Sequence, residues 1–101
     1  MKKPRSIVII GRRWFRRGAG NTYCTATIII DGEFVYKTPE QSGYADHYAD
    51  IACQWLEENG YITKRERHSN GGKAPHWRHI REDNGIAYHY EAADVACEKD
   101  L

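Results

Sequence analysis

Arginine and aromatic side chains are interleaved near the start of the chain, in the run Arg12-Arg13-Trp14-Phe15-Arg16-Arg17. A guanidinium group matches phosphate oxygens in bidentate geometry and also stacks on aromatic rings. Aromatic rings stack on nucleobases, so this combination is typical of surfaces that bind nucleotides or single strands. The run therefore predicts an anion-binding surface. The alternative interpretation is a solvated strand end whose Trp14 packs in the core.

Strand alternation selects which of these side chains act together. A strand over residues 6–17 places Arg12, Trp14 and Arg16 on one face. Asn21 and Tyr23 follow on the next strand, and we include them in the predicted ligand-binding set. The glycine-containing turn at residues 18–20 is either a plain hairpin turn or a nest of backbone amides that cradles an anion.

A second candidate cluster is His76-Trp77-Arg78-His79, from which we predict Trp77 and Arg78 as ligand-binding residues by the same arginine and aromatic logic. Two other interpretations compete. His76 and His79 could bind a metal with His89, or one of them could act as a general base, but no cysteine or glutamate stands at zinc spacing. The cluster could also be a solvated helix anchored by Trp77 and Ile80. Familiar catalytic and dinucleotide motifs are missing, so we predict no catalytic residues, no metal and no cofactor.

The charges are separated along the chain. Seven of the fifteen Lys and Arg residues lie in residues 1–20, whereas all fourteen Asp and Glu residues follow, although the formal net charge is only +1. The acidic remainder would repel extended duplex DNA wherever it approached. A small anion in a local basic pocket fits this distribution better.

The length of 101 residues predicts a single domain over residues 1–101, small enough to gain stability as a homo-oligomer. No stretch is apolar enough to cross a bilayer, so we expect a soluble, cytoplasmic protein with no membrane partner. Cys24, Cys53 and Cys97 are odd in number and widely spaced, which favours reduced thiols that fill small apolar spaces.

The elements that would position these residues begin with three strands, at residues 6–17, 21–30 and 33–38, joined by the hairpin signal Asp31-Gly32. Pro39 ends the third strand, and residues 41–43 connect to a helix. Apolar positions at three- and four-residue steps predict that helix over residues 44–58, closed by Asn59-Gly60.

Residues 63–74 are polar and predict a long loop, after which Pro75 suits the first turn of a short helix through residue 83. Alternation over residues 86–92 predicts a fourth strand. The predicted fold is α+β, an antiparallel sheet in the order β-β-β-α-α-β with the helices packed on one face. The other face would be available to a partner or ligand.

A family resemblance covers about the first sixty residues. It is carried by Arg13-Trp14-Phe15, Gly20-Asn21-Thr22-Tyr23, the Asp31-Gly32 hairpin, residues 43–48, and the segment from Trp55-Leu56 to Gly60-Tyr61. These segments resemble small accessory proteins of tailed phages, and among them the Thoeris anti-defence sponge family of the first type. Members sequester cyclic ADP-ribose isomers without cleaving them, assemble into oligomers, and in some cases bind small cyclic oligonucleotides.

The resemblance implies that this chain is a phage anti-defence protein of the host bacterial cytoplasm, not an enzyme, that sequesters a small cyclic nucleotide signal. Aromatic rings such as Trp14, Tyr44 or Trp77 would then sandwich adenine. Arginines such as Arg12, Arg16 or Arg78 would neutralise phosphates, and Asn21 would contact ribose or base edges.

Three other classes stay open. A protein-directed inhibitor, such as an anti-CRISPR, would present the acidic helix face of Asp46, Asp50 and Glu57 in place of phosphates. A single-strand nucleic-acid binder would use residues 12–23 and lose affinity steeply with salt. A metal-dependent nuclease would use the histidines and lose activity with a chelator.

Overall fold

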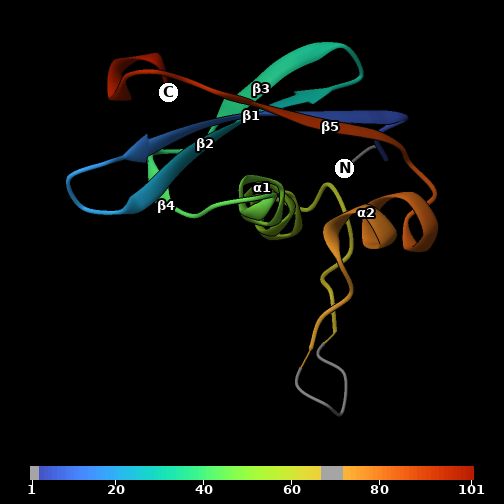
Figure 1. Ribbon diagram of the computed structural model, residues 1–101. Helices are drawn as coiled ribbons and strands as arrows, with labels where there is room; N and C mark the ends of the chain where they lie inside the picture. The colour runs from blue at the N-terminus through green and yellow to red at the C-terminus, as the bar shows by residue number, and fades with distance from the viewer. Residues whose placement is uncertain (1–2, 67–71) are drawn as a thin grey trace.

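The sheet begins with the predicted three-stranded meander. The computed structural model describes residues 3–66 and 72–101, and its first strands are β1 (Ser6–Arg16), β2 (Asn21–Ile30) and β3 (Glu33–Lys37). All three pair antiparallel (Figure 1). Asp31 and Gly32 both take positive φ, 52° and 83°, which is the backbone that a tight two-residue hairpin requires. The Asp31-Gly32 prediction is therefore confirmed.

Two further strands complete the sheet. β4 (Gln41–Ser42) pairs with the tip of β2 in a segment predicted to be only a connection. β5 (Ala87–Asp94) is the predicted fourth strand and lies beside β1, giving the order β3-β2-β1-β5. It runs parallel to β1, so the prediction of a fully antiparallel sheet is wrong at this strand. The reason is that the helices return the chain to the end of the sheet where β1 begins, shown by the bond from the Ala87 amide to the Arg5 carbonyl.

The main helix, α1 (His47–Glu58), confirms the predicted periodicity but begins later than predicted. Tyr44 precedes it, because Ala45 takes a positive φ of 55° that no helix accommodates. Gly60 ends the helix with a φ of 78°, and the Tyr61 amide donates to the Leu56 carbonyl, as the predicted C-terminal cap requires.

The second helical segment combines α2 (His76–Arg78) with a π-helical turn, η1 (His79–Asp83). It begins directly after Pro75 and ends before the turn at Gly85, in agreement with the sequence. The chain finishes in a short 3-10 turn, η2 (Glu98–Asp100), that the sequence did not predict. The described parts of residues 63–74 contain no helix or strand, as predicted.

One hydrophobic core lies between the sheet and the helices, which cover the same sheet face (Figure 1). The sheet contributes alternate residues such as Ile7, Ile9 and Ile28, and α1 contributes Ala52 and Leu56, all of them fully buried. This arrangement confirms the predicted α+β class with helices on one face. We call the opposite face the helix-free face.

The three cysteines do not share one environment. Cys24 and Cys53 are buried free thiols, as predicted, and burial raises the pKa of Cys53 to about 12. Burial also raises the pKa of Cys24. Cys97 is exposed, so its predicted role as an apolar filler is wrong. It lies in the segment that follows β5, directly before η2.

None of the helices in the described residues has the length and apolarity needed to span a membrane.

The approach of α1 to the sheet depends on one small residue. Gly11 is buried on β1, and a Cβ atom there would overlap the ring of Tyr48. We expect Gly11→Ala to lower the free energy of unfolding by about 1–3 kcal/mol, the usual cost of overpacking. Urea denaturation measures it. Gly18→Ala is the matched control, because a Cβ at Gly18 meets nothing within 4 Å. Equal stability of the two variants would contradict this packing.

Candidate functional site

The tip of the β1–β2 hairpin presents its arginines and aromatic rings on two different faces. Trp14 pairs with Tyr23 and Arg16 with Asn21, and these side chains lie on the helix-free face. Phe15 pairs with Thr22 between them, so both of these point to the opposite, helix side. The basic run is therefore divided by strand alternation into two surfaces.

The helix-free face holds five of the eight predicted ligand-binding residues. Arg12, Trp14 and Arg16 lie there on β1, and Asn21 and Tyr23 lie there on β2. The rings of Trp14 and Tyr23 stack with centroids 5.9 Å apart. Trp14 is partly buried by this contact and is not part of the core, so the alternative in which it packs inside the protein is wrong.

The other three predicted residues lie elsewhere. Tyr44 is on the helix side, in the segment that leads to α1, and 77% of its surface is exposed. Trp77 and Arg78 lie on α2 at the far end of the molecule from the hairpin tip (Figure 1). The eight residues therefore do not form one site. Trp77 is itself 38% exposed, so of the two predicted anchors of this helix only Ile80 is buried.

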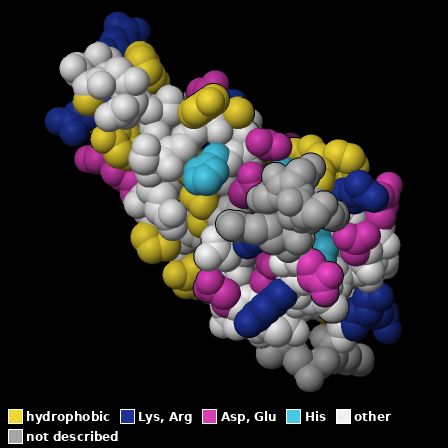
Figure 2. Space-filling model, turned by 90° about the horizontal axis from the view of Figure 1, so that it is seen from below, with side chains coloured by type: hydrophobic (Ala, Val, Ile, Leu, Met, Phe, Trp, Pro, Cys, Tyr) yellow, Lys and Arg dark blue, Asp and Glu magenta, His cyan; other side chains and the backbone are white. Residues whose placement is uncertain are grey.

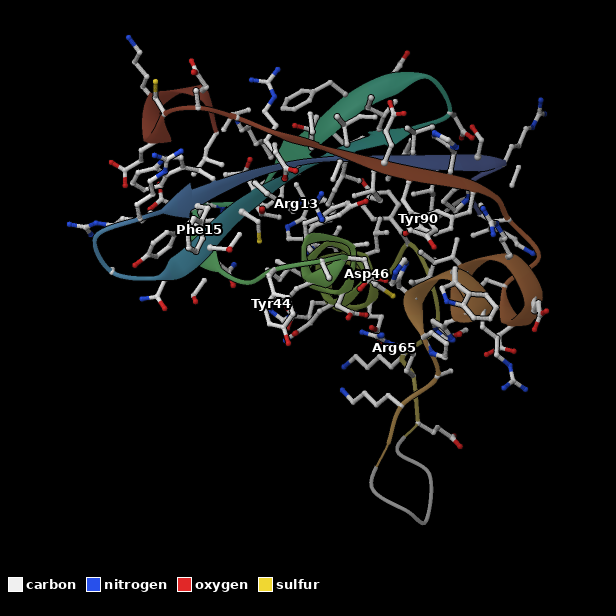
Figure 3. All side chains as sticks on the ribbon, viewed as in Figure 1. Arg13, Phe15, Tyr44, Asp46, Arg65 and Tyr90 are labelled. Atoms are coloured by element: carbon white, nitrogen blue, oxygen red, sulfur yellow. The ribbon has the colours of Figure 1, made fainter. Side chains whose placement is uncertain are left out.

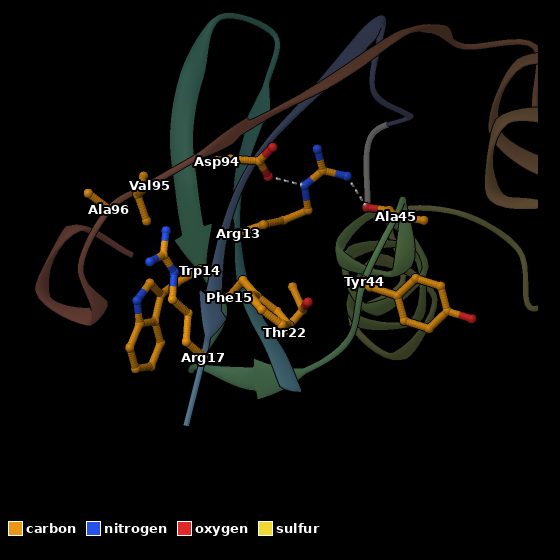
Figure 4. Close-up of a pocket in the computed structure, with 10 residues that line it drawn as sticks. All are labelled: Arg13, Trp14, Phe15, Arg17, Thr22, Tyr44, Ala45, Asp94, Val95 and Ala96. Atoms are coloured by element: carbon orange, nitrogen blue, oxygen red, sulfur yellow. Dashed lines mark hydrogen bonds and ion pairs between the residues drawn. The ribbon is translucent and has the colours of Figure 1, made fainter. Parts of the chain in front are cut away.

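A pocket lies beside the part of β1 that β5 leaves uncovered. Pairing between the two strands ends at Asp94, and the Val95 amide still donates to the Arg13 carbonyl, but β1 continues to Arg16. The open pocket there has a volume of about 820 Å³ (Figure 4). That volume lies in the range of small-molecule sites.

The pocket combines cationic and aromatic groups. Its arginines are Arg13 and Arg17, and its rings belong to Trp14, Phe15 and Tyr44. Figure 3 shows Phe15 and Tyr44 on the helix side of the sheet. The remaining wall is formed by short side chains and one acid, namely Thr22, Ala45, Asp94, Val95 and Ala96.

The two arginines of the pocket differ in their bonding. Arg13 donates from Nε to Asp94 Oδ1 at 2.9 Å and from Nη1 to the Ala45 carbonyl oxygen at 2.9 Å (Figure 4). It thereby ties β5 and the Tyr44 segment to β1, and its charge is matched by Asp94. Arg17 is exposed and makes no hydrogen bond or ion pair within residues 3–66 and 72–101. Arg17 supplies the unpaired positive charge.

The Tyr44 segment is held against the hairpin by its backbone. The Gly43 amide donates to the Thr22 carbonyl at 2.9 Å, next to the pairing of β4 with β2. Together with the Arg13 bond to Ala45, this fixes the chain on both sides of Tyr44 while its ring stays exposed. Phe15 is 55% exposed across the same pocket. Large exposed rings beside a cation mark a surface suited to ligands.

The hairpin turn is not an anion-binding nest. The amides of Ala19 and Gly20 both donate to the Arg16 carbonyl, at 3.3 and 2.9 Å. They are already used to close the turn, so the simpler interpretation as a hairpin turn holds.

Sequence reasoning missed most of this pocket. Of the residues that line the pocket it selected Trp14 and Tyr44, and it missed others, among them Arg13, Phe15, Arg17 and Thr22. The alternation of β1 did indicate Arg13 and Phe15, because it assigns the odd-numbered residues of this strand to the helix side. Alternation did predict that β5 ends near residue 92, but no sequence signal indicates which part of β1 it leaves unpaired or that the Tyr44 segment folds under the hairpin.

The histidines of the second helical segment are structural. His76 is 1% exposed, with Nδ1 2.8 Å from the Tyr88 hydroxyl and Nε2 3.1 Å from Asp46 Oδ2. His79 is also buried and contacts Asp83 and the Thr63 carbonyl. No group of three potential ligands for a metal ion occurs in the described parts of the chain. The metal interpretation therefore has no geometric support. The general-base interpretation stays a prediction, because His76 and its partner Asp46 also line a separate pocket.

The acids of α1 are also occupied. Glu57 is buried and binds Arg65 Nε at 2.8 Å, and Asp50 lies 3.5 Å from the same guanidinium. These pairs hold the start of the segment after α1 against the helix. In Figure 2, which shows the helix side, most Asp and Glu side chains lie away from the hairpin tip. At the tip itself, Lys and Arg side chains lie beside hydrophobic ones. A phosphate-mimicking face built on Glu57 would require a carboxylate that is not accessible.

Comparison with known proteins found no matching family model, no matching curated protein and no matching solved structure. The site is therefore interpreted from its own geometry.

The structural role of His76 gives a stability test. Tyr88→Phe removes the hydroxyl that bonds Nδ1 and leaves a buried ring nitrogen without a partner, so we expect the free energy of unfolding to fall by about 1–3 kcal/mol. Tyr90→Phe is the control, because that ring also packs on His76 but its hydroxyl makes no hydrogen bond within the described residues. Thermal denaturation compares them. A loss for Tyr90→Phe as large as for Tyr88→Phe would contradict the assignment.

Proposed function

We propose that this chain is a non-catalytic binding protein for a small anionic ligand with a planar ring, and that the ligand is a nucleotide. One observation supports this function most directly: the unpaired guanidinium of Arg17 and the rings of Trp14, Phe15 and Tyr44 all line the pocket at the hairpin tip. Guanidinium binds phosphate and exposed rings stack on a base.

The charge of the pocket favours a small ligand over a polyanion. Arg13 is balanced by Asp94 at 2.9 Å, so Arg17 alone contributes an uncompensated charge among the lining residues. A single guanidinium suits one or two phosphate groups. A nucleic-acid strand would require cations repeated along its backbone.

The lining residues also favour binding without chemistry. Asp94 is the one carboxylic acid among the residues that line the pocket, and it is held by Arg13. The lining contains no histidine, cysteine or lysine among the described residues. A general base or a nucleophile with an activating partner is therefore lacking at this place.

The finer part of the proposal comes from the family resemblance of the first sixty residues. We propose that the ligand is a cyclic nucleotide immune signal, either a cyclic ADP-ribose isomer or a cyclic oligonucleotide. The protein would sequester it intact as a phage anti-defence sponge in the host bacterial cytoplasm, as a homo-oligomer. A pocket of about 820 Å³ accommodates ligands of this class.

Arg17→Gln tests the pocket. Loss of a charge-assisted hydrogen bond to phosphate costs about 1.5–3 kcal/mol, so we expect affinity to fall about 10- to 100-fold. Isothermal titration calorimetry with cyclic ADP-ribose isomers and cyclic di- and trinucleotides measures it. Arg78→Gln, an exposed arginine on α2, is the matched control and should bind like the parent. If Arg78→Gln lost affinity and Arg17→Gln did not, the site would lie on α2.

Asp94→Asn tests the same pocket by removing a negative charge from it, whereas Arg17→Gln removes a positive one. The amide oxygen can still accept from Arg13 Nε, and the Ala45 carbonyl still holds the guanidinium, so Arg13 keeps its place. Its charge becomes available to the ligand, and we expect anion affinity to rise about two- to fivefold. The same titrations measure this increase. Unchanged or weaker binding, with the fold intact by circular dichroism, would count against the pocket.

A further inference from the structure

The end of β1 that β5 leaves uncovered contains a residue whose main-chain groups are unused. In an antiparallel pair of strands, residues whose main-chain groups point toward the partner strand alternate with residues whose groups point away from it. The Thr22 carbonyl accepts from the Gly43 amide, so the groups of Thr22 and of its partner Phe15 point away from each other. The N–H and the carbonyl of Phe15 therefore point to the side of β1 on which β5 lies.

β5 stops short of these two groups. The Val95 amide donates to the Arg13 carbonyl at 2.7 Å, and Phe15 is the next residue of β1 whose main chain faces that side. Within residues 3–66 and 72–101, neither the N–H nor the carbonyl of Phe15 makes a hydrogen bond. Phe15 thus presents one donor and one acceptor in the same direction at the open edge of the sheet.

The pocket at the hairpin tip passes this open edge. Trp14 lies on the helix-free face, whereas Phe15 and Tyr44 lie on the helix side, and all three rings line the pocket (Figure 4). A pocket can contact both faces of a sheet only around a free edge. Because β2 covers the other edge of β1, the edge that this pocket passes is the one at Phe15.

The short length of the open edge favours a small planar group over another strand. A strand that adds to a sheet pairs along several residues. Here the edge offers the groups of Phe15 alone, because Arg17, the next residue on this side, belongs to the turn. A nucleobase needs only one donor and one acceptor at its edge, and it stacks its two faces between aromatic side chains.

We infer that the main-chain N–H and carbonyl of Phe15 bind the edge of a nucleobase, an inference that rests on the proposed function. The base takes the place that a continued β5 would occupy beside β1. The rings of Trp14 and Tyr44, from opposite faces of the sheet, are available to its two faces, and Arg17 holds the phosphate. Adenine carries the required donor and acceptor side by side, in its 6-amino group with ring nitrogen N1 or N7.

Adenosine monophosphate (AMP) and its base analogues test this contact on the intact protein, because AMP contains each group that the contact uses. The purine analogue lacks the amino donor, and the 1-deaza and 7-deaza analogues each lack one ring acceptor. We expect the purine analogue to bind about tenfold more weakly than AMP, the effect of one unpaired hydrogen-bonding group. One deaza analogue should lose a similar factor, and the other is the matched control that binds like AMP. Isothermal titration calorimetry measures all four.

The N–H of Phe15 is removed without changing a side chain by incorporating phenyllactic acid at this position, which gives a main-chain ester. The fold should be unchanged in thermal denaturation, because this N–H bonds no group of the described residues. We expect the ester to weaken AMP binding about tenfold. The deaza analogue that binds weakly to the parent should lose no further affinity, since the bond that the ester removes is already missing.

The outcomes separate this contact from the pocket itself. If AMP and its purine analogue bound equally, and Arg17→Gln weakened both, the contact at Phe15 would be overturned while the nucleotide pocket would stand. An ester that weakened AMP and both deaza analogues by the same factor would also overturn the contact. Failure of AMP to bind, or binding that Arg17→Gln left unchanged, would contradict the contact and the proposed pocket together.

Discussion

The pairing of β1 with β2 is the interaction on which the rest of the molecule depends. Ten residue pairs join the two strands, from Ile7–Ile30 to Arg16–Asn21. The neighbours on either side are shorter: β3 has five residues and β5 ends at Asp94. The hairpin therefore extends beyond the elements that cover it. Its inner part forms the core with α1, and its tip leaves arginines and aromatic rings exposed.

The overhang has different consequences on the two faces. Beside the uncovered part of β1 it leaves an open pocket that the Tyr44 segment borders on the helix side, and Arg13 links the parts through Asp94 and Ala45. On the helix-free face it leaves cations that the chain covers with its own residues 98–101. The positive charges near the start of the sequence are thus concentrated at the hairpin. Part of this charge is neutralised by an acid from later in the chain, as in the pair of Arg13 with Asp94.

Much of the fold could be predicted because it is encoded locally. The hairpin at Asp31-Gly32, the periodicity of α1 and its end at Gly60 each depend on a few neighbouring residues. The direction of β5 could not be predicted, because the same alternating pattern suits either direction and only the path through the helices decides it. The first turn of α1 was misplaced because Tyr44 fits the apolar pattern, while the positive φ of Ala45 has no sequence signature.

The candidate site shows the same division. Sequence reasoning located the basic hairpin and grouped five residues that do share a face, from Arg12 to Tyr23. It joined Trp77 and Arg78 to them only by residue type, and the fold places these at the far end. The pocket depends on the register of β5 against β1 and on the path of the Tyr44 segment, which are tertiary features. The role of His76 could not be predicted from the sequence, because Tyr88 and Asp46, the partners of its two ring nitrogens, are distant along the chain.

The most direct test of the central claim is a set of nitrogen-15 and proton NMR titrations of the protein with a panel of cyclic ADP-ribose isomers and cyclic di- and trinucleotides. The account predicts the largest shifts at the amides of Phe15, Arg17, Thr22 and Tyr44 and at the Trp14 indole, the groups that line the pocket at the hairpin tip. Shifts centred on Trp77 and Arg78, or no shift with any nucleotide of the panel, would contradict it.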